Sequence, residues 1–344
     1  MKILILQLKR IGDLILTTPA IRCLREAYPN AHLALVADSS CRGLLEAIPV
    51  DECRIFERKG QWKGIFGFGP NAWVRTDLSA GHADFCLDFT GTDRSALLST
   101  LSASRRRVTF ERFRKKPLRK WLYTDFVNSS VRDRHTADHY TDLLRPLGIE
   151  REGVPLDLAL PGHAATTAKA ALAKAGVNEP YVVIHAGTAR AEKYWLPERW
   201  ARVIESLRTE QGLECVLTGS SDPAEQAHFA AIQASLQAPC PDLSGKTGLL
   251  ELAAIIRGAR LLCGVDTAAM HLADATGTPL VALFGPTNPF HWRPRHTRAI
   301  VLRSGVTGEF SPSQKGGPMQ GIAAGQVIEA VRGLLPESRR MAEM

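Results

Sequence analysis

The chain has 344 residues, a 45% hydrophobic and 7% aromatic composition and a net charge of +8, which together favour a two-domain α/β protein with sizeable cores. Its seven cysteines lack Cys-x-x-Cys spacing, which argues against a zinc site or a disulfide framework and for reduced thiols in a cytosol. The apolar run at residues 3–8 is too short for a signal peptide or a membrane span, so we expect a cytoplasmic protein.

The first half of the chain alternates apolar runs with amphipathic stretches, which predicts βα units around a parallel sheet. Strands are expected at residues 2–8, 33–37, 83–88 and 107–110. Helices are expected at residues 13–28, 42–47, 95–102 and 136–147. A linker is expected within residues 149–163, where Gly153, Pro155 and Pro161 interrupt the pattern.

The second half repeats this alternation and predicts a second parallel sheet. Strands are expected at residues 181–185, 214–218, 260–263 and 279–284. Helices are expected at residues 197–210, 222–236, 249–257, 266–276 and 324–335. We therefore divide the chain into residues 1–155, residues 156–322 and a last helical segment at residues 323–344.

Residues 264–287 hold a strand-turn-helix-strand pattern that suits an anion. Asp266 stands where a helix N-cap belongs, and Gly277 can end the helix in a left-handed conformation. The first free N–H groups would belong to residues 267–269, and unpaired donors together with the helix dipole favour negative charge there. His271 can add a donor one turn later, although a core histidine explains it equally well.

Two other segments place polar residues directly after a strand. Residues 9–13 form a basic turn that leads to Asp13 at a helix start, where the helix dipole alone would favour an acid. Thr188 and Lys193 follow the strand at residues 181–185, and a hydroxyl with an ammonium suits a phosphate. A turn threonine and a surface lysine are the simpler interpretation of that pair.

Three segments, at residues 1–20, 181–195 and 264–287 in chain order, resemble the bacterial glycosyltransferase family 9, the lipopolysaccharide heptosyltransferases, and are most similar to the heptosyltransferase III branch. The resemblance implies the α/β GT-B fold, with two doubly wound Rossmann-like domains facing a central cleft. Residues 1–155 would bind the acceptor and residues 156–322 the nucleotide sugar, while the last helix can pack back on the first domain. The implied activity is inverting, metal-independent transfer of heptose from ADP-heptose onto the lipopolysaccharide inner core.

The resemblance also implies roles for individual residues. Asp13 would be the catalytic base, and Asp266 would bind the donor sugar. The donor diphosphate would contact Thr188, Lys193, Thr267, Ala268 and His271, and the roles of Lys193 and Arg190 stay open. The nucleotide base or ribose would contact Asp222, Glu225, Lys246 and Thr247, although capping of the next helix is the simpler account of Asp222. No cofactor is expected.

Residues 105–120 hold nine basic residues against one acid, Glu111. A solvated loop is the ordinary interpretation, and no nucleic-acid motif accompanies the run. The resemblance favours instead an anionic glycolipid acceptor at the inner face of the inner membrane. Candidate residues for this surface are Lys9, Arg10, Arg112, Arg114, Lys115 and Lys116.

Three other functions stay open on the sequence. The chain could transfer a different nucleotide-linked sugar, act as a nucleotide-sugar epimerase, or bind a nucleotide sugar without catalysis. No Asp-x-Asp pair and no His/Cys cluster occurs in the sequence, so no metal ligands are assigned. The first strand also lacks the Gly-x-Gly-x-x-Gly turn of dehydrogenases.

Overall fold

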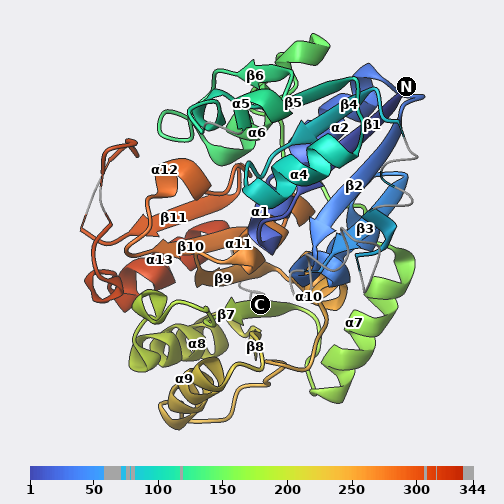
Figure 1. Ribbon diagram of the computed structural model, residues 1–344. Coiled ribbons are helices and arrows are strands. Elements are labelled where there is room, and N and C mark those ends of the chain that lie inside the picture. The colour runs from blue at the N-terminus through green and yellow to red at the C-terminus, as the bar shows by residue number, and fades with distance from the viewer. Residues whose placement is uncertain are drawn as a thin grey trace. The chain divides into compact units, whose positions relative to one another are not determined.

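The computed structural model describes residues 1–57, 71–74, 78, 82–116, 119–305, 308–314 and 316–335. The chain divides into unit 1, Met1–Ala159, and unit 2, Leu160–Met344, where the sequence predicted a division after residue 155. Each unit is built around one parallel sheet, coloured blue to teal in unit 1 and yellow-green to orange-red in unit 2 (Figure 1).

The sheet of unit 1 has the strand order β3-β2-β1-β4-β5-β6. Its strands are β1 (Lys2–Gln7), β2 (His32–Asp38), β3 (Glu52–Phe56), β4 (Phe85–Asp88), β5 (Arg106–Phe110) and β6 (Asp125–Val127). The order of connection reverses between β1 and β4, which are direct neighbours with Ile5 opposite Leu87. In such doubly wound sheets ligands bind at the carboxyl ends of the strands that flank this reversal.

The helices of unit 1 correct two predictions. The helix expected at residues 13–28 is two helices, because Pro19 has no N–H for the carbonyl of Ile15, which instead accepts from the Thr18 hydroxyl at 2.7 Å. The helix expected at residues 136–147 ends at Asp142, because Pro146 has no N–H to donate to the Asp142 carbonyl. The α-helices are α1 (Ile11–Ile15), α2 (Thr18–Ala27), α4 (Asp93–Leu101), α5 (Arg119–Leu122) and α6 (Thr136–Asp142). The 3₁₀ segments are η1 (Ser39–Ala47), η3 (Glu111–Phe113) and η4 (Arg145–Leu147).

The sheet of unit 2 has the strand order β11-β10-β9-β7-β8. Its strands are β7 (Tyr181–His185), β8 (Glu214–Leu217), β9 (Leu261–Val265), β10 (Leu280–Phe284) and β11 (Ala299–Arg303). The reversal here falls between β7 and β9, which pair with His185 opposite Gly264. The carboxyl ends of β7 and β9 are therefore the second place where a ligand site is expected.

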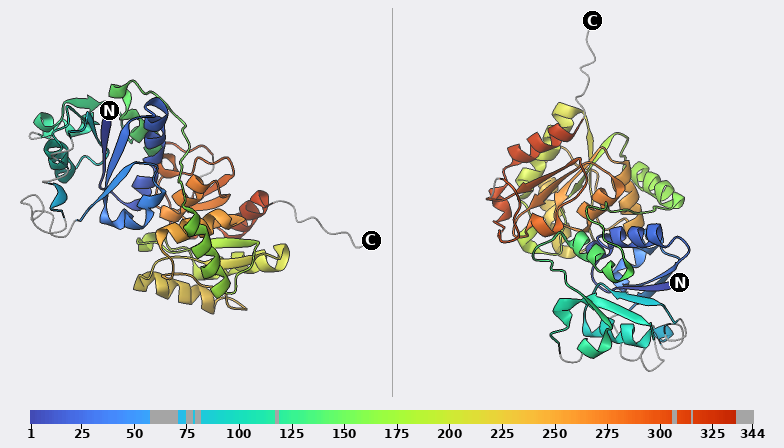
Figure 2. Two further views of the ribbon diagram at one scale, coloured as in Figure 1. Left: turned by 90° about the vertical axis from the view of Figure 1, so that its right-hand side faces the viewer. Right: turned by 90° about the horizontal axis from the view of Figure 1, so that it is seen from above.

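Helices cover both faces of the unit 2 sheet (Figure 2). They are α7 (Gly162–Lys174), α8 (Pro197–Gln211), α9 (Pro223–Ala234), α10 (Leu249–Gly258), α11 (Ala268–Thr276), α12 (Pro289–Trp292) and α13 (Ala324–Leu334), with the 3₁₀ turns η5 (Ala191–Lys193) and η6 (Met319–Gly321). The helix α7, which the sequence analysis did not predict, begins at the end of the expected linker and packs on α10. The last helix, α13, packs on α8, β9, β10 and β11 within unit 2. These contacts correct the expectation that it packs back on the first domain, because its apolar face is buried in the unit 2 core.

All seven cysteines are free thiols and six of them are buried. Among the described residues, no helix has both the length and the apolar character that crossing a bilayer requires.

Candidate active site

A pocket of about 340 Å³ opens at the reversal point of the unit 1 sheet. Leu8, Lys9 and Asp13 line it from the segment that follows β1, and Thr90 and Thr92 line it from the segment that follows β4. This place is the one that the strand order predicts for a ligand. The pocket thus brings the predicted base, Asp13, to a cavity large enough for a sugar-sized group.

The rim of this pocket carries positive charge. Arg10 and Arg94 are exposed and line it, and of the other charged lining residues Lys9 and Asp13 are half-buried and Asp38 is buried. The Asp38 carboxylate accepts hydrogen bonds from the backbone and the hydroxyl of Ser40, at 3.1 and 2.6 Å. The free charge at the rim is therefore cationic, which suits an anionic ligand.

Asp13 lies in the first turn of α1 with its side chain 18% exposed. Its Oδ1 accepts a hydrogen bond from the Tyr140 hydroxyl at 2.5 Å and lies 3.7 Å from the ammonium of Lys9. Its backbone is held too, since the Asp13 carbonyl accepts from Thr17 Oγ1, which accepts from the buried Gln7 amide, both at 2.8 Å. Lys9, predicted as an acceptor-surface residue, lines the pocket and donates to the Tyr140 hydroxyl at 2.9 Å.

A buried ion pair occupies the reversal point of the unit 2 sheet. The Lys193 ammonium, which follows β7, lies 2.7 Å from Asp266 Oδ2 and 2.8 Å from the Asp266 carbonyl oxygen at the end of β9. The two side chains are only 10% and 9% exposed. By contrast, Arg190 is exposed and bonds to Glu192 at 2.8 Å. Of these two cations, Lys193 is therefore the one that lies at this edge of the sheet.

The helix α11 begins one residue later than predicted. Thr267, in an extended conformation, is its N-cap, and Asp266 is not, because its carboxylate bonds to Lys193. Thr267 makes no side-chain cap, and its buried hydroxyl has no hydrogen-bond partner among the described residues. The N–H groups of the first turn, from Ala268 onward, have no intrahelical acceptor. His271 lies buried on the same helix.

Two further polar side chains lie at the end of β7. Thr188 is buried, and its Oγ1 accepts from the backbone N–H of Arg190 at 3.3 Å. His185 Nδ1 lies 2.9 Å from Thr218 Oγ1, and burial lowers the pKa of His185 to about 4. At neutral pH this histidine is uncharged and adds no positive charge beside Lys193.

The residues predicted to contact the nucleotide base or ribose lie further along the same edge. Asp222 caps α9 by accepting from the N–H of Ala224 at 2.9 Å, which is the simpler of its two predicted roles. Glu225 is buried and accepts from the N–H of Ser220 at 2.8 Å. Lys246 is exposed and donates to a backbone carbonyl, and Thr247 beside it is half-buried.

A flat aromatic surface, not predicted from the sequence, stands beside Glu225. The rings of Tyr194 and His228 are stacked at 4.5 Å between centroids. Gly187 follows β7 at close approach to Glu225, since an added Cβ would lie 2.2 Å from its Oε2. The stacked rings come from η5 and α9, so no local pattern in the sequence could reveal them.

Comparison with known proteins identifies this arrangement. Residues 73–321 match the profile of glycosyltransferase family 9 (heptosyltransferase). The chain belongs to this family. Lipopolysaccharide heptosyltransferase 3 of Escherichia coli is 28% identical to it over 333 residues, which are 95% of this chain and 97% of that protein.

Two solved structures share the fold of this family 9 glycosyltransferase. The crystal structure of a family 9 glycosyl transferase from Veillonella parvula DSM 2008 has a TM-score of 0.84 at 27% identity and covers 98% of this chain and 97% of its own. The structure of E. coli ADP-heptose lps heptosyltransferase II has a TM-score of 0.78 at 22% identity, with 97% and 98% covered. The predicted GT-B class and the predicted membership of family 9 are thereby confirmed.

The basic run of this glycosyltransferase is only partly a surface. Arg106, Arg107 and Arg119 bond to neighbouring protein groups, Arg119 to Asp93 at 2.5 Å. Their charges are used inside unit 1 and do not belong to an exposed patch. The exposed members that were predicted to bind an anionic acceptor are Arg112, Arg114, Lys115 and Lys116. Trp121, 76% exposed, lies close by in the sequence.

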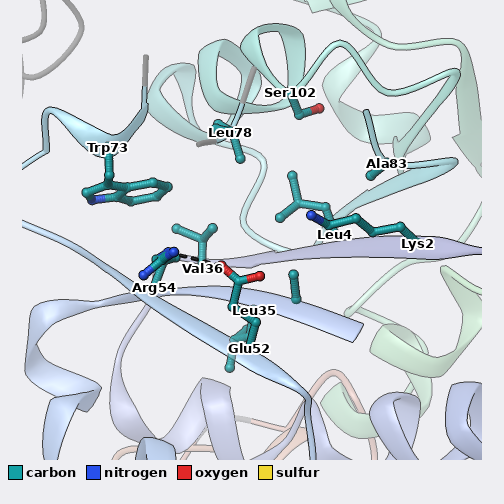
Figure 3. Close-up of a pocket in the computed structure, with 11 residues that line it drawn as sticks. Lys2, Leu4, Leu35, Val36, Glu52, Arg54, Trp73, Leu78, Ala83 and Ser102 are labelled. Atoms are coloured by element: carbon teal, nitrogen blue, oxygen red, sulfur yellow. Dashed lines mark ion pairs between the residues drawn. The ribbon is translucent and has the colours of Figure 1, made fainter. Parts of the chain in front are cut away.

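A second cavity in unit 1 is too small for a substrate (Figure 3). It measures about 30 Å³, room for one or two water molecules, and lies between strand residues such as Leu4 and Val36 and the side chains of Trp73 and Leu78. It holds none of the predicted site residues. Among the described residues, no group of three or more histidine, cysteine or acidic side chains could hold a metal ion.

Proposed function

We propose that this glycosyltransferase moves heptose from ADP-heptose onto the lipopolysaccharide inner core, with inversion at the anomeric carbon and without a bound metal ion. The names of its relatives support the donor and the pathway, since one is a lipopolysaccharide heptosyltransferase and another an ADP-heptose heptosyltransferase. The observation that carries the proposal is the different chemistry at the two reversal points. Unit 1 offers a carboxylate in a cationic pocket, and unit 2 offers a buried cation beside a helix N-terminus.

In the proposal Asp13 is the base for the acceptor hydroxyl. Its side chain lines the unit 1 pocket, and Oδ2 has no bond to Tyr140 or Lys9. Arg10 and Arg94 at the rim suit a phosphorylated or carboxylated sugar, because exposed guanidinium groups can bind such anions bidentately. A positioned base of this kind contributes about 10²- to 10⁴-fold to a rate.

Unit 2 binds the donor in the proposal. A diphosphate over the first turn of α11 would meet the free N–H groups from Ala268 onward and the partnerless Thr267 hydroxyl. It would also lie beside Lys193, with Thr188 and His271 as further contacts. Asp266 is then placed to accept from a sugar hydroxyl through Oδ1, because Oδ2 is bonded to Lys193.

In the proposed reaction one bond forms and one bond breaks. The acceptor hydroxyl oxygen forms a bond to the anomeric carbon while its proton passes to Asp13. The bond from that carbon to the β-phosphate oxygen breaks, and its electron pair leaves on ADP. Lys193 and the α11 N–H groups neutralise this developing charge, which is the role that Mg²⁺ or Mn²⁺ has in metal-dependent transferases.

The acceptor also gives the basic surface its role in the proposal. Arg112, Arg114, Lys115 and Lys116 would face an anionic glycolipid at the cytoplasmic face of the inner membrane. Family membership favours this reaction over the alternatives of an epimerase or a catalytically silent binding protein, since both lack an acceptor and need no base for its hydroxyl.

The test is incubation of the protein with ADP-heptose and truncated lipopolysaccharides, followed by mass spectrometry of the acceptor and NMR of the new anomeric centre. We expect one added heptose with inverted configuration. Asp13→Asn should lower kcat about 10²-fold or more while leaving the thermal shift by ADP unchanged. Asp133→Asn, an exposed acid of the same unit away from the pocket, is the matched control. Transfer by Asp13→Asn at the rate of Asp133→Asn would refute the role of the base.

A further inference from the structure

The carboxylate of Asp13 is held by two side chains that come from different parts of unit 1. Tyr140, on α6, is fully buried, and its hydroxyl lies 2.5 Å from Asp13 Oδ1. The Lys9 ammonium lies 2.9 Å from that hydroxyl and 5.0 Å from the centre of the tyrosine ring. Phe89 packs edge-on against the same ring at 5.7 Å and so fixes its orientation.

The proton count fixes the direction of each hydrogen bond in this group. An ammonium can only donate, so the Tyr140 oxygen accepts from Lys9 and gives its single proton to Asp13. Lys9 itself forms a salt bridge with Oδ1 at 3.7 Å, beyond ordinary hydrogen-bond distance, so it acts on the carboxylate directly by its charge and also through its hydrogen bond to the tyrosine. Oδ1 is thereby occupied, and Oδ2 is the oxygen left for a substrate.

The surroundings keep this direction of donation stable. Burial, and then the charge of Asp13, raise the pKa of Tyr140 well above its usual value, so the phenol stays protonated and remains a donor. The other charged groups that act on Lys9 are Arg112 and Asp88. His139, next to Tyr140 on α6, adds no charge, because burial lowers its pKa to about 3.

We propose that Tyr140, supported by Lys9, is the positioning residue for Asp13, and that it presents Oδ2 as the oxygen that takes the acceptor proton. This inference rests on the proposed role of Asp13 as base. It explains why Oδ2, and not Oδ1, is the oxygen that faces the acceptor hydroxyl. It also assigns Lys9 a function inside the pocket in place of the acceptor surface.

The test is Tyr140→Phe, which keeps the ring and its packing and removes only the hydroxyl. We expect kcat to fall about 10- to 100-fold, the size of one hydrogen bond to a charged group, with ADP binding unchanged. The KM for the acceptor should change little, because in the proposal the hydroxyl orients Asp13 and does not touch the substrate. Tyr123→Phe is the matched control, since Tyr123 also donates to a buried carboxylate of unit 1, that of Asp88. It should lower stability and leave kcat unchanged.

Lys9→Met gives a second readout that does not depend on the folding of Tyr140→Phe. It keeps the aliphatic stem over the ring, and it should also lower kcat while ADP binding stays unchanged. The double variant should lose less activity than the product of the two single losses, because part of the effect of Lys9 passes through Tyr140. Wild-type kcat in Tyr140→Phe, or a change that Tyr123→Phe shares, would overturn the positioning role. An active Asp13→Asn would overturn the base itself, so the two failures are distinguishable.

Discussion

The buried ion pair of unit 2 makes a quantitative prediction about stability. Lys193→Met removes the ammonium and leaves the Asp266 carboxylate, whose side chain is 9% exposed, without its partner. Breaking a buried pair in this way costs about 3–5 kcal/mol. The carboxylate directly precedes the N-cap of α11, and the helix dipole offsets about 0.3–1 kcal/mol of that loss. We therefore expect unit 2 to lose about 2–5 kcal/mol.

Hydrogen exchange along a urea titration is the suitable assay, read on peptides from β9 and α11. It follows unit 2 separately, which matters because a chain of two units need not unfold in one step. Arg190→Met is the control, since the ion pair of Arg190 with Glu192 has side chains 47% and 52% exposed and should contribute little to stability, because water screens it.

A second substitution tests the physical cause. If the loss comes from an uncompensated charge, adding Asp266→Asn to Lys193→Met should restore most of the stability. A loss no larger than that of Arg190→Met would refute the reasoning. A double variant less stable than Lys193→Met would also refute it, because the cost would then come from lost packing and not from charge.

Three other outcomes are expected. Activity should survive excess EDTA, because Lys193 and the α11 N–H groups neutralise the leaving diphosphate; loss with EDTA and recovery with Mg²⁺ would contradict this scheme. The stability of unit 2 should fall by about 3 kcal/mol as pH drops from 6.5 to about 4, because His185 takes up a proton in the unfolded chain at a higher pH than in the folded one, where its pKa is about 4. In denaturant titrations, the stability of His185→Asn should depend less on pH than that of the wild type. An unchanged pH dependence in His185→Asn would exclude this cause. Four exposed residues of the basic run can be replaced together by serine: Arg112, Arg114, Lys115 and Lys116. This change should raise the acceptor KM and make that KM less dependent on salt, since salt screens charges over a Debye length that falls from about 10 Å at 0.1 M to 3 Å at 1 M. The same number of charges removed from unit 2, at Lys169, Lys174, Arg257 and Arg260, should change neither, and equal effects of both sets would leave the run as a solvated loop.

The strands that could be predicted are those buried on both faces. Residues 181–185 were expected as a strand and are β7, because a strand covered by helices on both sides is a continuous apolar run. Three of the four edge strands, β3, β6 and β11, were missed, whereas the edge strand β8 was predicted from its buried apolar run. The sequences of β3 and β6 mix charged and apolar residues, since an edge strand is partly exposed, and such a mixture is also typical of loops. The apolar run of β11 carried a strand signal that the prediction overlooked.

Helix ends were predicted well where a single residue determines them. Gly277 ends α11 in the left-handed conformation expected of it, with φ of 71°. Pro19 carried an equally local signal, which the prediction of one helix over residues 13–28 overlooked. The start of α11 was placed one residue early, because the capping preference of Asp266 was outweighed by its contact with Lys193, 73 residues away in the sequence.

The sequence by itself determined where polar groups stand along the chain. Asp13 and Lys193 follow buried strands, and parallel strands present their carboxyl ends at one edge of a sheet, so both were expected at the edge where such sheets bind ligands. Only the tertiary structure decided their partners. Tyr140 meets Asp13 across 127 residues, and no local pattern encodes that contact. It depends on how α6 packs against α2, the helix that follows α1, and the buried tyrosine hydroxyl needs an acceptor that only the folded chain supplies.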